Sequence, residues 1–225
     1  AVKNVLGLKL SLGLLGERTA EAKTGGAPVT AKGADTAVHE RWTDEIAEQS
    51  VCIVRNEGDL LPLKLRPGAT VLTVSCAFDE DTRGFVKELS VVDDELERRG
   101  FHVEHLLNPG NDVLNARSGE FDAVFMNIHV MPRYGTTRMF GQIASIFWNS
   151  FWHGHAAVVF TSFGDPYKLY EMPYVPNFVM TFSNTPSSQR AAVRTWLGEL
   201  EPAGKLPVRL PGYFERQVGG ATRSR

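Results

Sequence analysis

Short runs of apolar residues alternate along the chain with segments in which apolar residues recur at helical spacing. The clearest run is residues 156–161, AAVVFT, which leads into the polar loop 162–167, SFGDPY. An apolar run bounded by turn residues is typical of a strand buried in a parallel sheet. Gly164 can adopt backbone angles that other residues avoid, and Asp165 before Pro166 indicates a helix start. The pattern therefore predicts a strand, a tight loop and a helix. In open α/β sheets, loops at the carboxyl ends of strands bind ligands.

The same alternation continues over most of the chain. Strands are predicted at residues 70–76, 101–106, 122–128, 156–161 and 178–182, and helices at residues 44–54, 83–99, 113–117, 137–151, 166–170 and 186–197. Strands that alternate with helices form a parallel sheet covered on both faces. The sequence therefore predicts an α/β fold, a three-layer α/β/α sandwich with about five or six mainly parallel strands.

The beginning of the chain has a different pattern. Residues 2–15 carry apolar side chains at helical spacing on two faces, so a helix there needs partners for both. The stretch 17–35 has few apolar residues and several Gly, Thr and Ala, which is typical of a linker. We therefore predict an N-terminal helical arm with its linker over residues 1–40 and the sandwich over residues 41–225.

Composition narrows the functional classes. The chain of 225 residues is 43% hydrophobic and 22% charged, with a formal net charge of -2. These values are ordinary for a globular protein and argue against a nucleic-acid binder. No apolar run approaches the length of a membrane span, so no membrane partner is expected. No signal-peptide layout is present. The sequence does not distinguish a cytoplasmic from a secreted location. Cys52 and Cys76 lie in apolar segments, which predicts buried thiols.

Candidate binding residues gather at the predicted carboxyl edge of the sheet. Asp79 follows the first core strand, and His129 follows the third with Arg133 close behind. Gly164 and Asp165 follow the strand at residues 156–161. Because ligands bind at this edge in open α/β sheets, these residues are the predicted substrate-binding positions. For His129 the alternative is a structural histidine whose hydrogen bonds are satisfied within the fold.

Other patterns carry weaker chemical signals. His153 and His155 are spaced like metal ligands, but no third ligand lies nearby and they precede a strand, so no metal site is predicted. Ser162 lacks the flanking glycines of a nucleophile elbow, which leaves a hydrolase using Ser162 and His129 as a remote alternative. No GxGxxG loop follows the first core strand, so no cofactor is expected.

Four segments in order resemble the C-terminal domain of family 3 glycoside hydrolases. Residues 46–63, IAEQSVCIVRNEGDLLPL, are similar to the helix, Asn and LPL turn that open that domain. The loop SFGDPY resembles the SFGNPY loop of the β-N-acetylhexosaminidase branch, with Asp165 in the Asn position. PSSQRAAVRTWLGE at 186–199 and GKLPVRLPGYF at 204–214 resemble the last helix and the closing tail of that branch. In this tail Leu206, Val208 and Leu210 alternate with other residues, which predicts an edge strand.

The resemblance implies that the catalytic residues belong to a different domain from the one in this chain. In this family the nucleophilic aspartate, and in the hexosaminidase branch a His/Asp general acid, belong to an N-terminal (β/α) barrel. No segment of this chain carries the catalytic motif of that barrel, so no catalytic residue is predicted. Residues 2–15 resemble the last barrel helix, which would make residues 1–40 the end of the barrel domain. The implied function is an accessory domain that packs on the barrel and can lend loops to a carbohydrate site.

A second interpretation is a free-standing α/β module that binds a small sugar or a partner protein. Aromatic side chains at residues 140–152 could stack on the face of a sugar in such a module. The same residues have the helical spacing of a core helix, which is the alternative for this segment.

Overall fold

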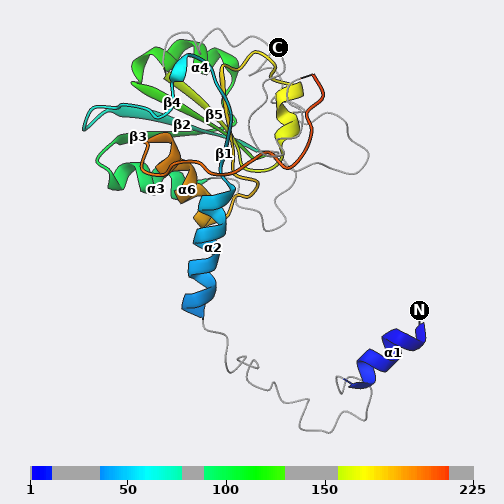
Figure 1. Cartoon of the computed structure of the whole chain (residues 1–225). Helices are drawn as coiled ribbons and strands as arrows, with labels where there is room; N and C mark the ends of the chain where they lie inside the picture. Colours follow the sequence, from blue (N-terminus) through cyan, green and yellow to red (C-terminus); the bar gives the residue numbers. More distant parts are fainter. Residues whose placement is uncertain (1, 12–35, 78–88, 130–156, 213–225) are drawn as a thin grey trace. The chain divides into compact units, whose positions relative to one another are not determined.

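A computed structural model describes residues 2–11, 36–77, 89–129 and 157–212 of the chain (Figure 1). The chain divides into two units, residues 1–39 and 40–225. In the first unit, α1 (Val2–Ser11) is a helix without a buried residue. Its apolar side chains Val2, Val5, Leu6, Leu8 and Leu10 are exposed. The predicted N-terminal helix is present over this range.

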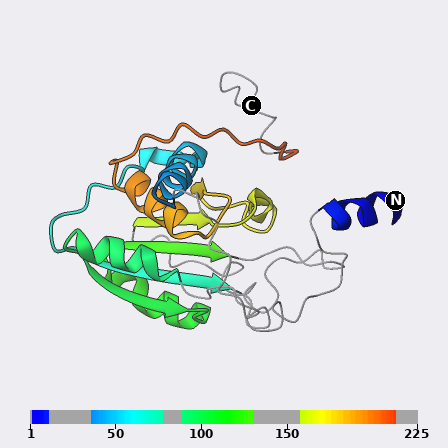
Figure 2. The same ribbon diagram turned by 90° about the horizontal axis from the view of Figure 1, so that it is seen from below.

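The second unit is built on a six-stranded sheet with the order β1-β6-β5-β4-β2-β3. The strands are β1 (Cys52–Asn56), β2 (Thr70–Ala77), β3 (His102–Leu107), β4 (Ala123–His129), β5 (Ala157–Ser162) and β6 (Asn177–Met180). All neighbouring pairs are parallel except β1 with β6, which is antiparallel. In Figure 2 the arrowheads of the parallel strands point to one side, which is the carboxyl edge of the sheet. The predicted mainly parallel α/β sheet is confirmed.

Helices and apolar loops cover both faces of the sheet, which gives the predicted three layers. The elements on the first face are α3 (Ser90–Arg98), α6 (Pro186–Trp196) and the end of α2 (Thr36–Ser50), and those on the second are α4 (Asn111–Arg117), the short 3-10 helices η3 (Ser118–Glu120) and η6 (Pro166–Tyr170), and the chain after α6. Successive side chains of a strand point to opposite faces. In β4, Phe125 therefore packs in the first core and Met126 in the second.

The segment before the first core strand differs from the prediction. The helix expected over residues 44–54 begins earlier and ends at Ser50, and Cys52–Asn56 forms the edge strand β1. Ile53 and Val54 are β-branched and favour a strand, and pairing with β6 decides the conformation of this segment. Asn56 does not end a helix. Its side chain instead accepts from the Leu61 N–H at 3.0 Å and donates to the Leu61 carbonyl at 2.9 Å, which closes the loop that contains η2 (Glu57–Asp59).

The tail after α6 is also different from the prediction. The edge strand expected at Leu206, Val208 and Leu210 is absent from the described residues, where only Leu210 forms an isolated bridge. Leu206 and Leu210 are nevertheless buried and pack against the sheet, so their alternation anchors the tail to the core. Gly204 allows the tail to cross close to α2, because a Cβ there would lie 2.4 Å from the Ser50 carbonyl oxygen.

The remaining elements lie within a few residues of their predicted positions. The exceptions are the first part of the helix at 83–99 and the whole helix at 137–151, which lie outside the described residues. Both cysteines are free and buried as predicted, and burial raises the pKa of Cys52 to about 11. No helix in the described ranges has the length and apolar character needed to cross a membrane.

Candidate functional site

The carboxyl ends of β4 and β5 bring together a group of polar side chains in the second unit. β4 ends at His129 and β5 ends at Ser162, and the N–H of Phe163 donates to the Ile128 carbonyl at 2.8 Å. The loop then runs through Gly164 into η6. We call His129, Ser162, Gly164, Asp165 and Lys168 the edge cluster. In Figure 2 the yellow helix η6 lies on the side to which the strand arrowheads point.

The loop after β5 is closed by its own serine hydroxyl. Ser162 Oγ donates to the Asp165 carbonyl at 2.8 Å and accepts from the Gly164 N–H at 3.4 Å. Ser162 is fully buried, so this hydroxyl is engaged in holding the loop. The remote alternative of a Ser162 nucleophile gains no support from this geometry. Gly164 is not among the described glycines with positive φ, so the expected special backbone angle is not its role.

Asp165 has two partners, one for each carboxylate oxygen. Its Oδ1 accepts from the Tyr167 N–H at 2.9 Å and caps η6, and Pro166 begins that helix, so the predicted helix start is confirmed. Its Oδ2 lies 3.0 Å from Lys168 Nζ. Asp165 therefore fixes the direction of η6 and is the counter-ion of a lysine.

Lys168 is the member of the edge cluster that the sequence interpretation missed. Its side chain is 0% exposed, although lysine is almost never fully buried without a partner. Burial lowers the pKa of Lys168, while the charges of Asp165 and Glu171 oppose that shift. The spacing of Asp165 and Lys168, three residues apart across a helix start, was the available sequence signal.

His129 is buried at the end of β4, with 7% of its surface exposed. Burial lowers the pKa of His129, and the positive charge of Lys168 lowers it further. Both causes favour the neutral imidazole, which can accept as well as donate a hydrogen bond. The edge cluster thus combines a neutral imidazole, a carboxylate and a buried amine behind the carboxyl edge of the sheet.

The structure brings together three of the predicted binding positions: His129, Gly164 and Asp165. Asp79 and Arg133 lie outside the described residues, as do His153 and His155 and the aromatic segment 140–152. Their roles stay predictions. Within the described ranges, no group of three or more His, Cys, Asp or Glu side chains could hold a metal ion.

Replacing His129 with asparagine is expected to reduce the pH dependence of stability below neutrality. The folded state binds the His129 proton more weakly than the unfolded chain, whose histidine has a pKa near ~6.5. The free energy of unfolding therefore falls as the pH decreases from this value toward the lowered pKa, and it is constant above it as far as this group is concerned. Urea unfolding between about pH 5 and 8 measures the slope for the wild type and for His129→Asn. Equal slopes would contradict the assignment, and Lys168→Met should also reduce the slope.

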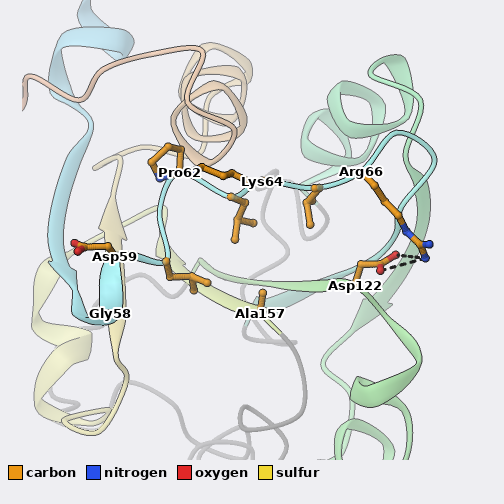
Figure 3. A pocket seen from close by; sticks show the side chains of 10 residues that line it. Gly58, Asp59, Pro62, Lys64, Arg66, Asp122 and Ala157 are labelled. Carbon is orange, nitrogen blue, oxygen red and sulfur yellow. Dashed lines mark hydrogen bonds and ion pairs between the residues drawn. The ribbon is translucent and has the colours of Figure 1, made fainter.

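A pocket of about 630 Å³ lies at the opposite, amino edge of the sheet (Figure 3). It is lined by the loop from Gly58 to Arg66 together with Asp122 and Ala157, which sit at the starts of β4 and β5. Two of its charged side chains pair with each other, because Arg66 Nη2 lies 3.4 Å from Asp122 Oδ1, as the dashed lines in Figure 3 mark. Asp122 also accepts from the Thr70 N–H at 2.9 Å. The contacts of Asp122 with Arg66 and with the Thr70 N–H therefore hold this loop at the edge of the sheet.

Comparisons with known proteins place the fold. No protein-family model matches the sequence, and no curated protein sequence matches it. Among solved structures, a glycoside hydrolase family 3 β-N-acetylglucosaminidase from Paenibacillus sp. str. FPU-7 is similar over 92% of this chain, with 19% identity and a TM-score of 0.61. A fungal multi-domain GH3 β-N-acetylglucosaminidase is similar over 82%, with 19% identity and a TM-score of 0.64. The β-glucoside phosphorylase BglX is similar over 76%, with 22% identity and a TM-score of 0.61.

The match covers most of this chain and a smaller part of each relative. The chain spans 38% of the Paenibacillus protein, 21% of the fungal protein and 32% of BglX. At these identities the likeness establishes the fold. The resemblance indicated by the sequence motifs is therefore confirmed at that level: the chain has the fold of one part of larger family 3 glycoside hydrolase proteins.

Proposed function

We propose that this chain is the accessory α/β domain of a glycoside hydrolase similar to β-N-acetylhexosaminidases. In this proposal a (β/α) barrel carries the catalytic groups, and this domain packs on it and supports the sugar site. The observation that carries the proposal is the similarity of 92% of this chain to only 38% of a β-N-acetylglucosaminidase. The SFGDPY loop and the GKLPVRLPGYF tail support the choice of branch.

The edge cluster is consistent with a supporting role. The Ser162 hydroxyl holds its own loop, and the Asp165 carboxylate is shared between the Tyr167 N–H at the start of η6 and Lys168. His129 is buried and its pKa is lowered, so it is uncharged near neutral pH. These groups shape the carboxyl edge, where the partly exposed Gly164 and Asp165 can contact a neighbouring domain or a bound sugar.

An activity assay tests the proposal from one side. We expect the purified chain to release no product from 4-methylumbelliferyl N-acetyl-β-D-glucosaminide. Turnover that is abolished by His129→Ala or Ser162→Ala would overturn the proposal, because this chain would then hold its own catalytic groups. Both variants are compared with the wild type by urea unfolding, so that loss of turnover is not confused with loss of the fold.

A search for the barrel tests it from the other side. The reading frame upstream of Ala1 and the neighbouring genes are examined for a (β/α) barrel, and the barrel is produced together with this chain. We expect the two to co-purify in equal amounts and to hydrolyse the same substrate. A barrel that is fully active without this chain and does not bind it would contradict the proposal.

A further inference from the structure

Exposed tyrosines follow the edge cluster directly. Tyr167 is 41% exposed, Tyr170 is 44% exposed and Tyr174 is 40% exposed. They lie in and just after η6, on the carboxyl side of β5. Their neighbours Pro166, Lys168 and Leu169 are buried, so η6 presents its tyrosines outward while its other side packs on the core. The segment is the yellow helix of Figure 1, beside the orange-red tail.

The rings of Tyr167 and Tyr170 form a regular pair. Their planes are 8° from parallel and their centroids are 6.5 Å apart. This spacing follows from the backbone, because residues i and i+3 eclipse each other in a 3-10 helix with a rise of roughly 2 Å per residue. The geometry of the 3-10 helix therefore determines the distance between the two rings. We call Tyr167 and Tyr170 the tyrosine pair.

The tyrosine pair is held by contacts at both ends of the segment. Asp165 caps the Tyr167 N–H at 2.9 Å, and the Tyr170 hydroxyl donates to the Pro211 carbonyl at 3.1 Å. Further along, Arg55 donates to the carbonyls of Pro173 and Val175 at 2.8 and 2.7 Å. The backbone of this segment and the Tyr170 side chain are thus already fixed, so a ligand that packs there has less conformational freedom to remove, which favours binding.

We propose that the tyrosine pair binds the apolar face of a carbohydrate, namely an oligosaccharide of N-acetylglucosamine. A pyranose ring presents C–H groups on its face and hydroxyl groups around its rim. Tyrosine matches this chemistry, because its ring is apolar and its hydroxyl is polar. Successive sugar rings of an oligosaccharide can contact successive aromatic rings along η6. The choice of N-acetylglucosamine rests on the proposed function, whereas the ring geometry is independent of it.

Calorimetric titration of the purified chain with tri-N-acetylchitotriose tests the proposal, with cellotriose as the comparison sugar. We expect saturable binding of tri-N-acetylchitotriose that is weakened about tenfold or more in Tyr167→Ala. Tyr167→Phe keeps the ring and should retain most of the affinity. Trp42→Ala is the matched control, because Trp42 is another exposed aromatic side chain, 52% exposed, on α2. Urea unfolding of each variant verifies that the fold is intact.

The outcomes separate this proposal from the proposed function. No binding by the wild type at about 10 mM sugar, or equal affinity in Tyr167→Ala, would overturn the tyrosine pair as a sugar site. Neither result would affect the proposed accessory role, which the co-purification with the barrel tests separately. Tighter binding of cellotriose than of tri-N-acetylchitotriose would overturn the assignment to N-acetylglucosamine. Equal weakening by Trp42→Ala would overturn the location of the site.

Discussion

Replacing Asp165 with alanine is expected to lower the free energy of unfolding by about 4–6 kcal/mol. The change removes the counter-ion of Lys168, whose side chain is 0% exposed, and the acceptor for the Tyr167 N–H. Removing one partner of a buried ion pair costs about 3–5 kcal/mol, since an uncompensated charge is left behind. Loss of a helix cap adds about 1 kcal/mol. Urea unfolding followed by circular dichroism measures the sum.

Two matched variants separate the two losses. Asp165→Asn keeps an oxygen that can cap η6 and removes the charge, so we expect most of the destabilisation to remain. Lys168→Met removes the fully buried charge and leaves that of Asp165, whose side chain is 15% exposed, so we expect a smaller loss, about 0–2 kcal/mol. If both variants were as stable as the wild type, the buried pair would not contribute as we infer.

The pH dependence of the free energy of unfolding of Asp165→Asn is a second, independent test of the buried pair. Burial lowers the pKa of Lys168 and the charge of Asp165 opposes that shift, so the variant should have a still lower pKa at Lys168. Between that pKa and the value of ~10.4 for the unfolded chain, the unfolded state binds more protons than the folded state. The free energy of unfolding must therefore rise with pH in this window. The deficit of Asp165→Asn should shrink at alkaline pH, whereas that of Asp165→Ala should keep the part due to the lost cap.

The strands could be predicted from the sequence where their apolar runs are continuous. β4 and β5 are buried on both faces, and their short apolar runs with β-branched and aromatic residues, bounded by turn residues, predict strands. β1 could not be recognised in the same way, because its residues continue the apolar spacing of α2. Its strand conformation depends on antiparallel pairing with β6, which lies more than a hundred residues later in the chain. Local patterns do not contain a contact of that kind.

The candidate site was predictable in its location but only partly in its chemistry. The position of Asp165 before Pro166 indicated the cap, and the end of β4 placed His129 at the carboxyl edge. The burial of Lys168 was not visible, because a lysine is ordinarily exposed. Its burial arises from the three-residue repeat of η6, in which Lys168 and Leu169 face inward while Tyr167 faces outward. A helical period of 3.6 would distribute these residues differently.

Replacing Trp196 with alanine is expected to lower the free energy of unfolding by about 4–6 kcal/mol, an effect comparable to that of Asp165→Ala. Trp196 is the largest fully buried side chain in the described residues. Its ring stacks on Phe125 with centroids 4.6 Å apart, and its Nε1 donates to Thr161 Oγ1 at 3.1 Å. The substitution leaves a cavity between α6 and the sheet and also leaves the Thr161 hydroxyl without this donor. Urea unfolding is followed by circular dichroism, because the substitution removes a tryptophan that would otherwise report unfolding by fluorescence.

Graded variants make the result interpretable even if the alanine variant does not fold. Trp196→Phe keeps an aromatic ring against Phe125 and loses the hydrogen bond to Thr161, so we expect a loss of about 2 kcal/mol. Trp42→Ala removes an exposed tryptophan and should change stability by less than about 0.5 kcal/mol. Because Thr161 precedes Ser162 at the end of β5, the contact of Trp196 with Thr161 joins α6 to the strand that carries the edge cluster. Equal effects of Trp196→Ala and Trp42→Ala would show that α6 is not fixed to the sheet in this way.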